Sequence, residues 1–397
     1  FMSFAFDGAQ ERWLSVLLAG GSLVIRDDQL WTPEQTLLAL REQRVTVACF
    51  PPAYLQQLAE VALVQGNPPP VHTYCFGGDA VPDASFELVK RALRPQRLIN
   101  GYGPTETVVT PLLWRAEMTD CCEAAYAPIG RGVAGRGLYV LDADLNPLPA
   151  GVSGELYLGG ECLARGYHGQ PGLSAERFVP DPFDAKGGRM YRTGDRVRQR
   201  ECGLIDYLGR LDQQVKIRGF RIELGEIEAR LRQCEGVQDA AVKVIEGPTG
   251  KQLAGYVVAS GTLLERTLKE QLQAHLPDYM VPSHIVPMAR FPLSANGKLD
   301  RRALPEPQLA QGTYRAPRNE LEQALALIWQ EVLGLEQVGI DDNFFELGGD
   351  SLQVLKVISR VRNQPQLGFS LKLRDLMQKP CIAELSGFEP VALAQAP

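Results

Sequence analysis

Glycine recurs between short apolar runs throughout Ile129–Leu211, and this pattern constrains the fold more than any other feature of the chain. Four segments carry it: GLYVLD, GELYLGG, GRMYRTGD and GLIDYLGR. Glycine between such runs marks tight turns. The pattern therefore predicts a region of short strands that follow one another closely in the sequence.

The flanking residues predict helices and strands in other combinations. Residues 1 to 211 begin with β-rich runs that alternate with helical ones, whereas residues 213–305 predict a compact α+β unit. Strands are expected at Ser22–Ile25, Val45–Phe50, Asp239–Val244 and Leu253–Val258. Helices are expected at Pro33–Gln43, Ala53–Val64, Ile222–Cys234 and Leu263–His275.

The C-terminal residues predict a small helical bundle that follows a linker. Leu304–Glu320 is rich in Pro, Gln, Ala and Gly, as linkers often are. An amphipathic helix follows, which Asn319 can cap and Gly334 can end. Further helices are expected over Leu352–Val361 and roughly over Ile382–Gly387, which completes the pattern of a bundle.

Composition narrows the class of protein. The chain has 397 residues, 45% of them hydrophobic, which is enough for roughly two or three domains. A net charge of −6 weighs against a nucleic-acid partner, and no apolar run is long enough to span a membrane. The first residues, FMSFAFDGAQERW, do not resemble a signal peptide.

Cysteine and histidine usage gives no sign of a disulfide framework or a zinc site. The eight cysteines have no CxxC spacing, and the four histidines do not cluster. Reduced cysteines in a cytoplasmic protein are the better interpretation. A metal ion held by oxygen ligands and a substrate phosphate remains open.

Ser351 stands out within FFELGGDSL, Phe344–Leu352, because two glycines and an aspartate place it at a turn that opens into an apolar helix. The free amides and the positive dipole end of a helix start favour a phosphate group. A phosphodiester-linked arm on Ser351 is one interpretation, and simple helix capping is the other.

Further segments can bind a nucleotide. In NGYGPTET, Thr105 and Glu106 offer a hydroxyl and a carboxylate to an Mg²⁺-bound phosphate, and Tyr102 offers a flat face to a base. In YRTGD, Asp195 can accept hydrogen bonds from ribose hydroxyls. In each case an ordinary polar turn is the alternative.

Two charged segments lie nearer the C-terminus. The run Gly209–Glu228 mixes both signs of charge with glycine, which suggests a hinge between two units rather than a solvated helix face. In LSANGKLDR, an Asn-Gly turn presents Lys298, which can neutralise phosphate charge or remain an inert surface lysine.

These segments occur in one order along the chain: SFAFDG, NGYGPTE, GELYLGGECLARGY, YRTGD, GRLDQQVKIRGFRIELGEIE, LPDYMVP, NGKLDR and LGGDS. In content and order they resemble the adenylation domain of nonribosomal peptide synthetases, in the ANL adenylate-forming superfamily, followed by a peptidyl carrier (thiolation) domain. The resemblance covers essentially the whole chain.

The resemblance implies a multidomain α/β protein. We expect a partial adenylate-forming core with a β-barrel-like part at 1–211, and a small mobile α+β subdomain at 212–305. A linker at 306–318 and a four-helix carrier domain at 319–390 complete it. The family's phosphate loop, of the YTSGTTGxPKG kind, does not occur here, so we expect residues 1–211 to be the C-terminal part of the large subdomain.

The same resemblance assigns roles to individual residues. Lys298 bridges the substrate carboxylate and the α-phosphate, Asp212 is the hinge, and Ser351 carries 4′-phosphopantetheine. Thr105 and Glu106 contact phosphate and Mg²⁺, and Asp7 pairs with the substrate α-ammonium. The nucleotide site comprises Gly78, Asn100, Tyr102, Asp195, Tyr207 and Arg210. The side-chain pocket comprises Gly8, Glu11, Cys49, Cys75, Gly77, Gly101, Val109 and Thr110.

The implied activity is ATP-dependent formation of an aminoacyl adenylate, followed by thioester formation on the arm, as in siderophore or peptide antibiotic biosynthesis. Glu11 adds a carboxylate to the pocket and needs a cationic partner, so we expect a substrate such as lysine or ornithine. The alternative is that Glu11 turns away or pairs with a protein cation.

The resemblance also implies partners: a phosphopantetheinyl transferase, neighbouring condensation or epimerisation domains, and an MbtH-like protein. Two other functions stay open. The chain can be a carrier or docking fragment without adenylation activity, or a relative of acyl-CoA ligases. Asp7 and the fused carrier weigh against the second.

Overall fold

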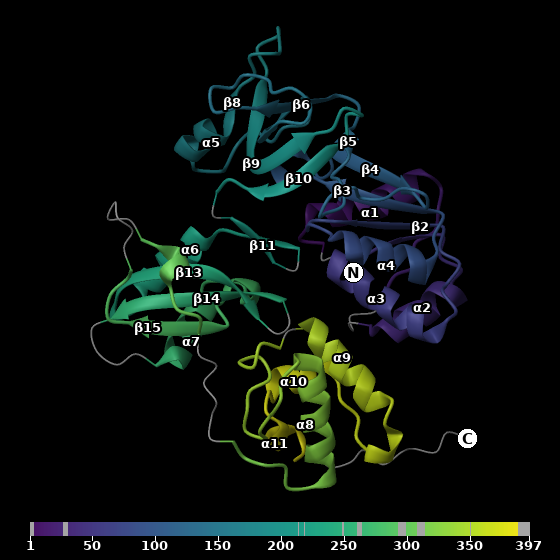
Figure 1. Ribbon diagram of the computed structural model, residues 1–397, viewed down its shortest axis with the longest axis vertical. Coiled ribbons are helices and arrows are strands. Elements are labelled where there is room, and N and C mark those ends of the chain that lie inside the picture. The colour runs from purple at the N-terminus through teal and green to yellow at the C-terminus, as the bar shows by residue number, and fades with distance from the viewer. Residues whose placement is uncertain are drawn as a thin grey trace. The chain divides into compact units, whose positions relative to one another are not determined.

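The computed structural model describes residues 4–26, 31–212, 214–217, 219–247, 250–259, 264–292, 299–307, 314–349 and 351–387. These residues fall into two compact units: the first comprises the described residues of 1–29 and 33–221, and the second comprises those of 30–32 and 222–397 (Figure 1).

A five-stranded sheet begins the first unit. Its order is β1-β2-β3-β4-β5, in which β1, β2 and β3 are parallel and the last two strands pair antiparallel. Because the carboxyl ends of parallel strands meet at one edge, this sheet has a single edge where ligands can gather. The strands are β1 (Val47–Cys49), β2 (Thr73–Gly77), β3 (Arg97–Tyr102), β4 (Leu112–Glu117) and β5 (Arg131–Gly132).

Helices connect the parallel strands. In the sequence α3 lies between β1 and β2, and α4 lies between β2 and β3, as parallel pairing requires. The helices expected at Pro33–Gln43 and Ala53–Val64 are confirmed within a residue at each end, as is a shortened strand within Val45–Phe50. The helices are α1 (Asp7–Leu18), α2 (Pro33–Glu42), α3 (Pro52–Gln65) and α4 (Asp83–Leu93).

The strand expected at Ser22–Ile25 is wrong. These residues form no regular element, and Ile25 is 85% exposed. A strand exists only when its backbone groups pair with a neighbour, and among the described residues no strand pairs with this stretch. The apolar pattern indicated a tendency to be buried but could not supply the partner.

The glycine-punctuated region forms a second, antiparallel sheet in the same unit, ordered β10-β9-β7-β6, with β8 also paired to β9. The expected strands are confirmed. Tyr102 and Leu112 of the first sheet share a buried cluster with Leu156 and Val197 of the second. The elements are β6 (Arg136–Leu141), β7 (Ser153–Gly160), α5 (Pro171–Arg177), β8 (Phe178–Pro180), β9 (Arg189–Gln199) and β10 (Ile205–Arg210).

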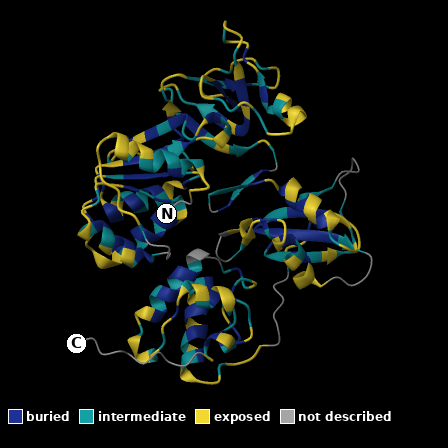
Figure 2. Cartoon of the chain, turned by 180° about the vertical axis from the view of Figure 1, so that it is seen from behind, coloured by how far each residue is buried: buried dark blue, intermediate teal, exposed yellow. Residues whose placement is uncertain are grey.

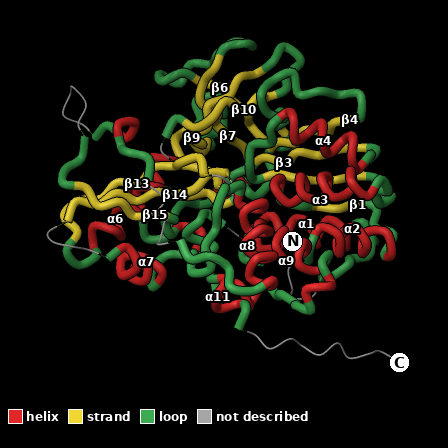
Figure 3. The backbone as a smooth tube through the Cα atoms, turned by 60° about the horizontal axis from the view of Figure 1, so that its bottom comes forward, coloured by secondary structure: helices red, strands yellow, loops and turns green. Residues whose placement is uncertain are grey.

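A short hairpin follows, formed by β11 (Val215–Ile217) and β12 (Phe220–Ile222). Beyond it, β14 pairs antiparallel with β13 and parallel with β15, and α6 and α7 cover one face of this sheet (Figure 3). The predicted helices and strands of this α+β region are confirmed with shifted ends. They are α6 (Leu224–Gln233), β13 (Val237–Gly247), β14 (Gly250–Ala259), α7 (Glu265–Gln273) and β15 (His284–Met288).

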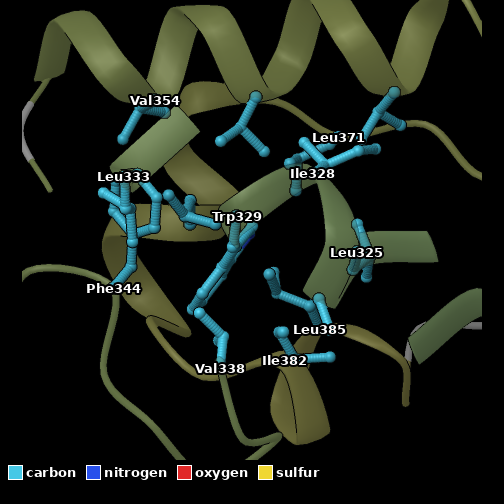
Figure 4. Close-up of a cluster of buried hydrophobic side chains, with 14 of the residues drawn as sticks. Leu325, Ile328, Trp329, Leu333, Val338, Phe344, Val354, Leu371, Ile382 and Leu385 are labelled. Carbon is cyan, nitrogen blue, oxygen red and sulfur yellow. The ribbon is translucent and has the colours of Figure 1, made fainter. Parts of the chain in front are cut away.

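The C-terminal helices enclose a core of their own. Trp329 is fully buried and meets the ring of Phe344 edge-on at 4.8 Å between centroids (Figure 4). Asn319 caps α8 and Gly334 ends it in the left-handed conformation, both as expected. The helices of the expected four-helix domain are α8 (Glu320–Leu333), α9 (Ser351–Arg362), α10 (Leu373–Gln378) and α11 (Ile382–Leu385), of which α10 is the one whose position the sequence had not indicated.

Residues are buried inside each sheet region and inside the C-terminal helical bundle. The strands of the sheets and the inner faces of α8 and α9 are buried, while the outer helix faces are exposed (Figure 2). Each region therefore has its own hydrophobic core, as separately folding regions require.

A buried carboxylate ties the ends of the C-terminal bundle together. Glu322 accepts hydrogen bonds from the backbone N–H of Arg318 at 2.7 Å and from the Ser386 hydroxyl at 2.8 Å, and it pairs with the Arg318 side chain. The Arg318 hydrogen bonds lower the pKa of Glu322 to about 2 against the opposing effect of burial. Glu322 therefore connects the residues before α8 to those after α11.

Acid should loosen the bundle through this residue. The folded pKa of about 2 lies below the usual 4.5, so the stabilisation is complete above pH 4.5 and declines as pH falls towards 2. Hydrogen-exchange protection of α8 in the intact chain should fall over this window. Glu322→Gln should reduce protection already at neutral pH, whereas Glu336→Gln, at an exposed position, should not. Equal protection in all three proteins at neutral pH would contradict this role.

Candidate active site

A buried carboxylate lies where the two sheets of the first unit meet. Asp195 on β9 is 3% exposed, accepts a hydrogen bond from the Tyr102 hydroxyl and pairs with Arg210 at 2.8 Å. The register of β9 and β10 sets Arg210 opposite Asp195, and Tyr102 is the last residue of β3. Arg210 also binds Asp212 at 2.8 Å. The structure thus brings together three predicted nucleotide residues and the predicted hinge residue.

Charge pairing sets the protonation of this cluster. Burial and the adjacent Asp195 raise the pKa of Tyr102 well above its usual value, so its hydroxyl stays protonated and can donate. Burial would raise the pKa of Asp212, but the Arg210 guanidinium outweighs it and holds that pKa below its usual range. Both aspartates are therefore held next to a permanent cation.

Lys216 lies over the two tyrosines of this site. Its Nζ is 5.3 Å from the ring centroid of Tyr102 and 5.7 Å from that of Tyr207. Burial lowers the pKa of Lys216, while Asp195 and Asp79 oppose that shift. The sequence interpretation gave Lys216 no role, although it belongs to the charged run on which the resemblance drew.

Glu106 lies in a second polar cluster, built from four segments. Its carboxylate accepts hydrogen bonds from Tyr167 at 2.8 Å and Tyr191 at 2.9 Å, and pairs with Arg221 at 3.0 Å. Burial would raise the pKa of Glu106, but Arg221 and the two hydroxyls outweigh it, so the pKa lies below its usual range. Thr105, beside it, is exposed.

Sequence reasoning did not single out Tyr167, Tyr191 or Arg221. A signal was present, because all three lie within the quoted segments GELYLGGECLARGY, YRTGD and GRLDQQVKIRGFRIELGEIE. A short segment does not reveal which carboxylate its side chains will meet when that carboxylate lies far away in the sequence.

The cluster around Glu106 offers Mg²⁺ a single carboxylate ligand. No group of three or more His, Cys, Asp or Glu side chains with metal-binding geometry occurs among the described residues. Mg²⁺ commonly binds through one or two carboxylates together with substrate phosphates and waters. Glu106, a carboxylate that is ionised at neutral pH, meets that requirement as a single protein ligand.

Asp7 and Glu11 lie on α1, within one and a half turns of each other. Oδ1 of Asp7 accepts a hydrogen bond from Gly8 N–H at 2.7 Å, whereas its Oδ2 is buried with no hydrogen-bond partner among the described residues. Oε2 of Glu11 accepts a hydrogen bond from Thr110 at 3.1 Å and lies 3.7 Å from Arg12. A protein cation therefore stands beside Glu11.

Four of the residues predicted for the side-chain pocket lie on the three parallel strands. Cys49 ends β1, Cys75 and Gly77 lie on β2, and Gly101 lies on β3. A Cβ on Gly77 would come within 2.2 Å of the carbonyl oxygen of Gly101, so close strand approach requires glycine there. This glycine therefore has a packing reason, in addition to any space it leaves for a substrate.

The other predicted residues are placed as follows. Asn100 donates a hydrogen bond to the Pro128 carbonyl at 2.9 Å, and Gly78 adopts a left-handed φ of +85°. Val109 follows Val108, and both have positive φ (60° and 56°), which is strained for β-branched residues. Ser351 is the first residue of α9.

Lys298 lies outside the described residues, but the segment that follows it is well anchored. Arg301 pairs with the buried carboxylate of Glu228 on α6. The Asp300 side chain accepts hydrogen bonds from the backbone of Arg302 and Ala303.

No helix of the described structure combines the length and apolar character that a membrane span requires.

Comparisons with known proteins agree with this arrangement. The sequence matches the family of AMP-binding enzymes over residues 1–168, the AMP-binding enzyme C-terminal domain over 226–298 and the phosphopantetheine attachment site over 323–388. It is 44% identical to a component of the linear gramicidin synthase of Brevibacillus parabrevis over 97% of its length. It is also 44% identical to a dimodular nonribosomal peptide synthase of Bacillus subtilis (strain 168), again over 97%.

The chain spans 5% of the first of these relatives and 16% of the second. Among solved structures, it is similar to holo-PA1221, a nonribosomal peptide synthetase protein with adenylation and PCP domains bound to a vinylsulfonamide inhibitor. That similarity has a TM-score of 0.79 and 29% identity, over 97% of this chain and 64% of the other. The chain therefore belongs to the AMP-binding enzymes, as adenylation-domain sequence fused to a phosphopantetheine carrier domain of the nonribosomal peptide synthetase type.

Proposed function

We propose that this chain activates an amino acid with ATP and transfers the aminoacyl group to a phosphopantetheine arm on Ser351. The observation that carries the proposal is the position of two charged clusters at the carboxyl end of β3: Asp195 binds Tyr102, the last residue of that strand, and Glu106 lies in the segment that follows it. Such an edge is where open α/β sheets bind their ligands.

Each part of this edge suits one part of the reactants. The Asp195 carboxylate, paired with Arg210, can accept hydrogen bonds from ribose hydroxyls. The buried Oδ2 of Asp7 can pair with an α-ammonium group, since a buried carboxylate oxygen without a partner is costly. The substrate carboxylate is already an anion, so its attack on the α-phosphorus of ATP needs no general base.

The electrostatic requirement of the first step is to offset negative charge on the phosphates. Mg²⁺ bound to ATP would supply part of that positive charge, and Glu106 would hold it in exchange for its pairing with Arg221. We assign to Lys298 the second positive charge that the phosphates need. Pyrophosphate then leaves with the electrons of the bond that breaks.

Ser351 is suited to hold the arm. As the first residue of α9, it lies where backbone amides point towards a phosphate and the helix dipole favours negative charge. The attached arm supplies a thiol that accepts the aminoacyl group as AMP departs. We further propose Asp212 as the hinge between the two steps, because its pairing with Arg210 anchors the chain just before the β11–β12 hairpin.

For the substrate we propose a long cationic amino acid such as lysine or ornithine, because Glu11 brings a carboxylate to the pocket beside Thr110. Arg12 lies 3.7 Å from Glu11 and competes for the same oxygen, so an uncharged substrate is the alternative. Proposed partners are a phosphopantetheinyl transferase, neighbouring synthetase domains and an MbtH-like protein. The free state of all eight cysteines supports a cytoplasmic location.

Arm attachment should depend on Ser351 alone. With a phosphopantetheinyl transferase and coenzyme A, the intact chain should gain the mass of one arm, and Ser351→Ala should gain none. Ser359→Ala, on the same helix, should gain the arm as the wild type does. Mass gain by Ser351→Ala would contradict the assignment.

Loading should depend on Lys298. Given ATP, Mg²⁺ and amino acids, the arm-bearing wild type should form a thioester, and Lys298→Ala should do so at least about a hundredfold more slowly. Lys251→Ala, at an exposed lysine, is the control and should load normally. If the wild type accepts the arm but never loads, a carrier function without adenylation is the right one.

Substrate choice should depend on Glu11. In ATP–pyrophosphate exchange, Glu11→Gln should reduce the preference for lysine or ornithine over leucine at least about tenfold, since losing the partner of a buried charge costs about 1.5–3 kcal/mol. Arg12→Gln should leave or strengthen that preference. An unchanged preference in Glu11→Gln would show that Arg12, not the substrate, is the partner of Glu11.

A further inference from the structure

Two of the eight cysteines are direct neighbours across a pair of strands. Cys49 on β1 and Cys75 on β2 are register partners in a parallel pair, so their side chains leave the sheet on the same face. Neighbouring strands lie about 4.8 Å apart, which is within the range of about 4.4–6.8 Å that disulfides span between Cα atoms. The register alone therefore makes each thiol the nearest cross-strand neighbour of the other.

The two thiols differ in a way that suits sequential reaction. The adjacent Cys75 thiol lowers the pKa of Cys49 to about 7, against burial; the nearby Arg12 guanidinium contributes in the same direction and Glu11 opposes it. The adjacent Cys49 and burial raise the pKa of Cys75. Cys49 is half-buried and Cys75 is buried. Cys49 is thus the more acidic and more accessible thiol, and Cys75 stands behind it as a proton donor.

The strand that carries Cys49 can adjust. Within the described sheet β1 is the edge strand and has three residues, so β2 is its one hydrogen-bonded strand neighbour there. Closing a disulfide from two adjacent parallel strands requires the sulfur atoms to approach to about 2.05 Å. A short edge strand can accommodate that approach with less disturbance than a central one.

We propose that Cys49 and Cys75 are a reversible redox pair that a low-molecular-weight disulfide closes. The thiolate of Cys49 attacks one sulfur of oxidised glutathione, and one glutathione leaves as its thiolate. Cys75 then gives up its proton and attacks Sγ of Cys49, and the second glutathione leaves. In total two protein thiols are oxidised to one disulfide, and one oxidised glutathione is reduced to two thiols.

The consequence for catalysis rests on the proposed function, which places both cysteines in the side-chain pocket. A bond between them draws the end of β1 towards β2 and replaces two polarisable thiols by a rigid bridge. The pocket then no longer has the shape that accepts the substrate side chain. Oxidation would therefore stop amino-acid activation, and reduction would restore it.

The bond itself is tested without any activity. The intact chain is equilibrated with reduced and oxidised glutathione at a series of ratios, quenched with acid, alkylated and digested with trypsin. Val45–Lys90 contains both cysteines and has no internal lysine or arginine, so it is a single tryptic peptide. Under oxidising ratios it should lose both alkyl groups together and become lighter than the unalkylated reduced peptide by two hydrogen atoms.

Single variants separate the two steps. Cys75→Ser should leave a glutathione adduct on Cys49, whereas Cys49→Ser should leave Cys75 reduced. Cys162→Ser, which removes an exposed cysteine, should leave the disulfide unchanged. A wild-type peptide that stays fully alkylated, or that carries glutathione without closing, under ratios that glutathionylate Cys162 would overturn the redox pair.

The link to the pocket is measured separately by amino-acid-dependent ATP–pyrophosphate exchange. Exchange should be lost as the disulfide forms and should return with reductant. The double variant Cys49→Ser/Cys75→Ser should keep its own starting rate under the same oxidation. Exchange that persists with the disulfide closed would overturn the pocket assignment, whereas absence of exchange in the reduced protein would count against the proposed function.

Discussion

The first unit depends on the neutralisation of one buried carboxylate. Asp195 is almost inaccessible to water, and an unpaired charge there would cost several kcal/mol. Its two partners come from different sheets: Tyr102 ends a strand of the parallel sheet, and Arg210 lies opposite in the antiparallel one. Because both must be present, the pairing fixes how the two sheets meet. The pairing also places the polar side chains of both sheets at the carboxyl end of β3, where Tyr102 lies.

The same logic extends to Glu106. Its carboxylate is bound by Arg221 and by the hydroxyls of Tyr167 and Tyr191, so the site is charge-balanced in this structure. A metal ion that binds Glu106 has to compete with that guanidinium. The Glu106 carboxylate thus requires a positive charge beside it, and Arg221 supplies that charge within the chain itself.

The sequence predicted most local structure, because caps, turns and periodicity are local. Asn319 and Gly334 bound α8 as expected, and glycine-rich turns separate the strands of the second sheet. Tertiary partners were harder to predict. Ser22–Ile25 has a strand-like composition and no strand partner among the described residues, whereas Lys216 lies over two tyrosines from other segments rather than on a solvated face. Family resemblance placed Asp195 and Arg210 in one site, but the arginine beside Glu106 became visible only in three dimensions.

Glu322 has a practical consequence for recombining carrier domains between synthetases. Its carboxylate holds Arg318, which precedes α8 in sequence, and Ser386, which follows α11. A crossover placed between Arg318 and Ser386 would separate Glu322 from one of these two partners. The buried charge of Glu322 would then lose a hydrogen bond that stabilises it. The smallest exchangeable cassette therefore extends from Arg318 to Ser386, and its fusion points belong outside both residues.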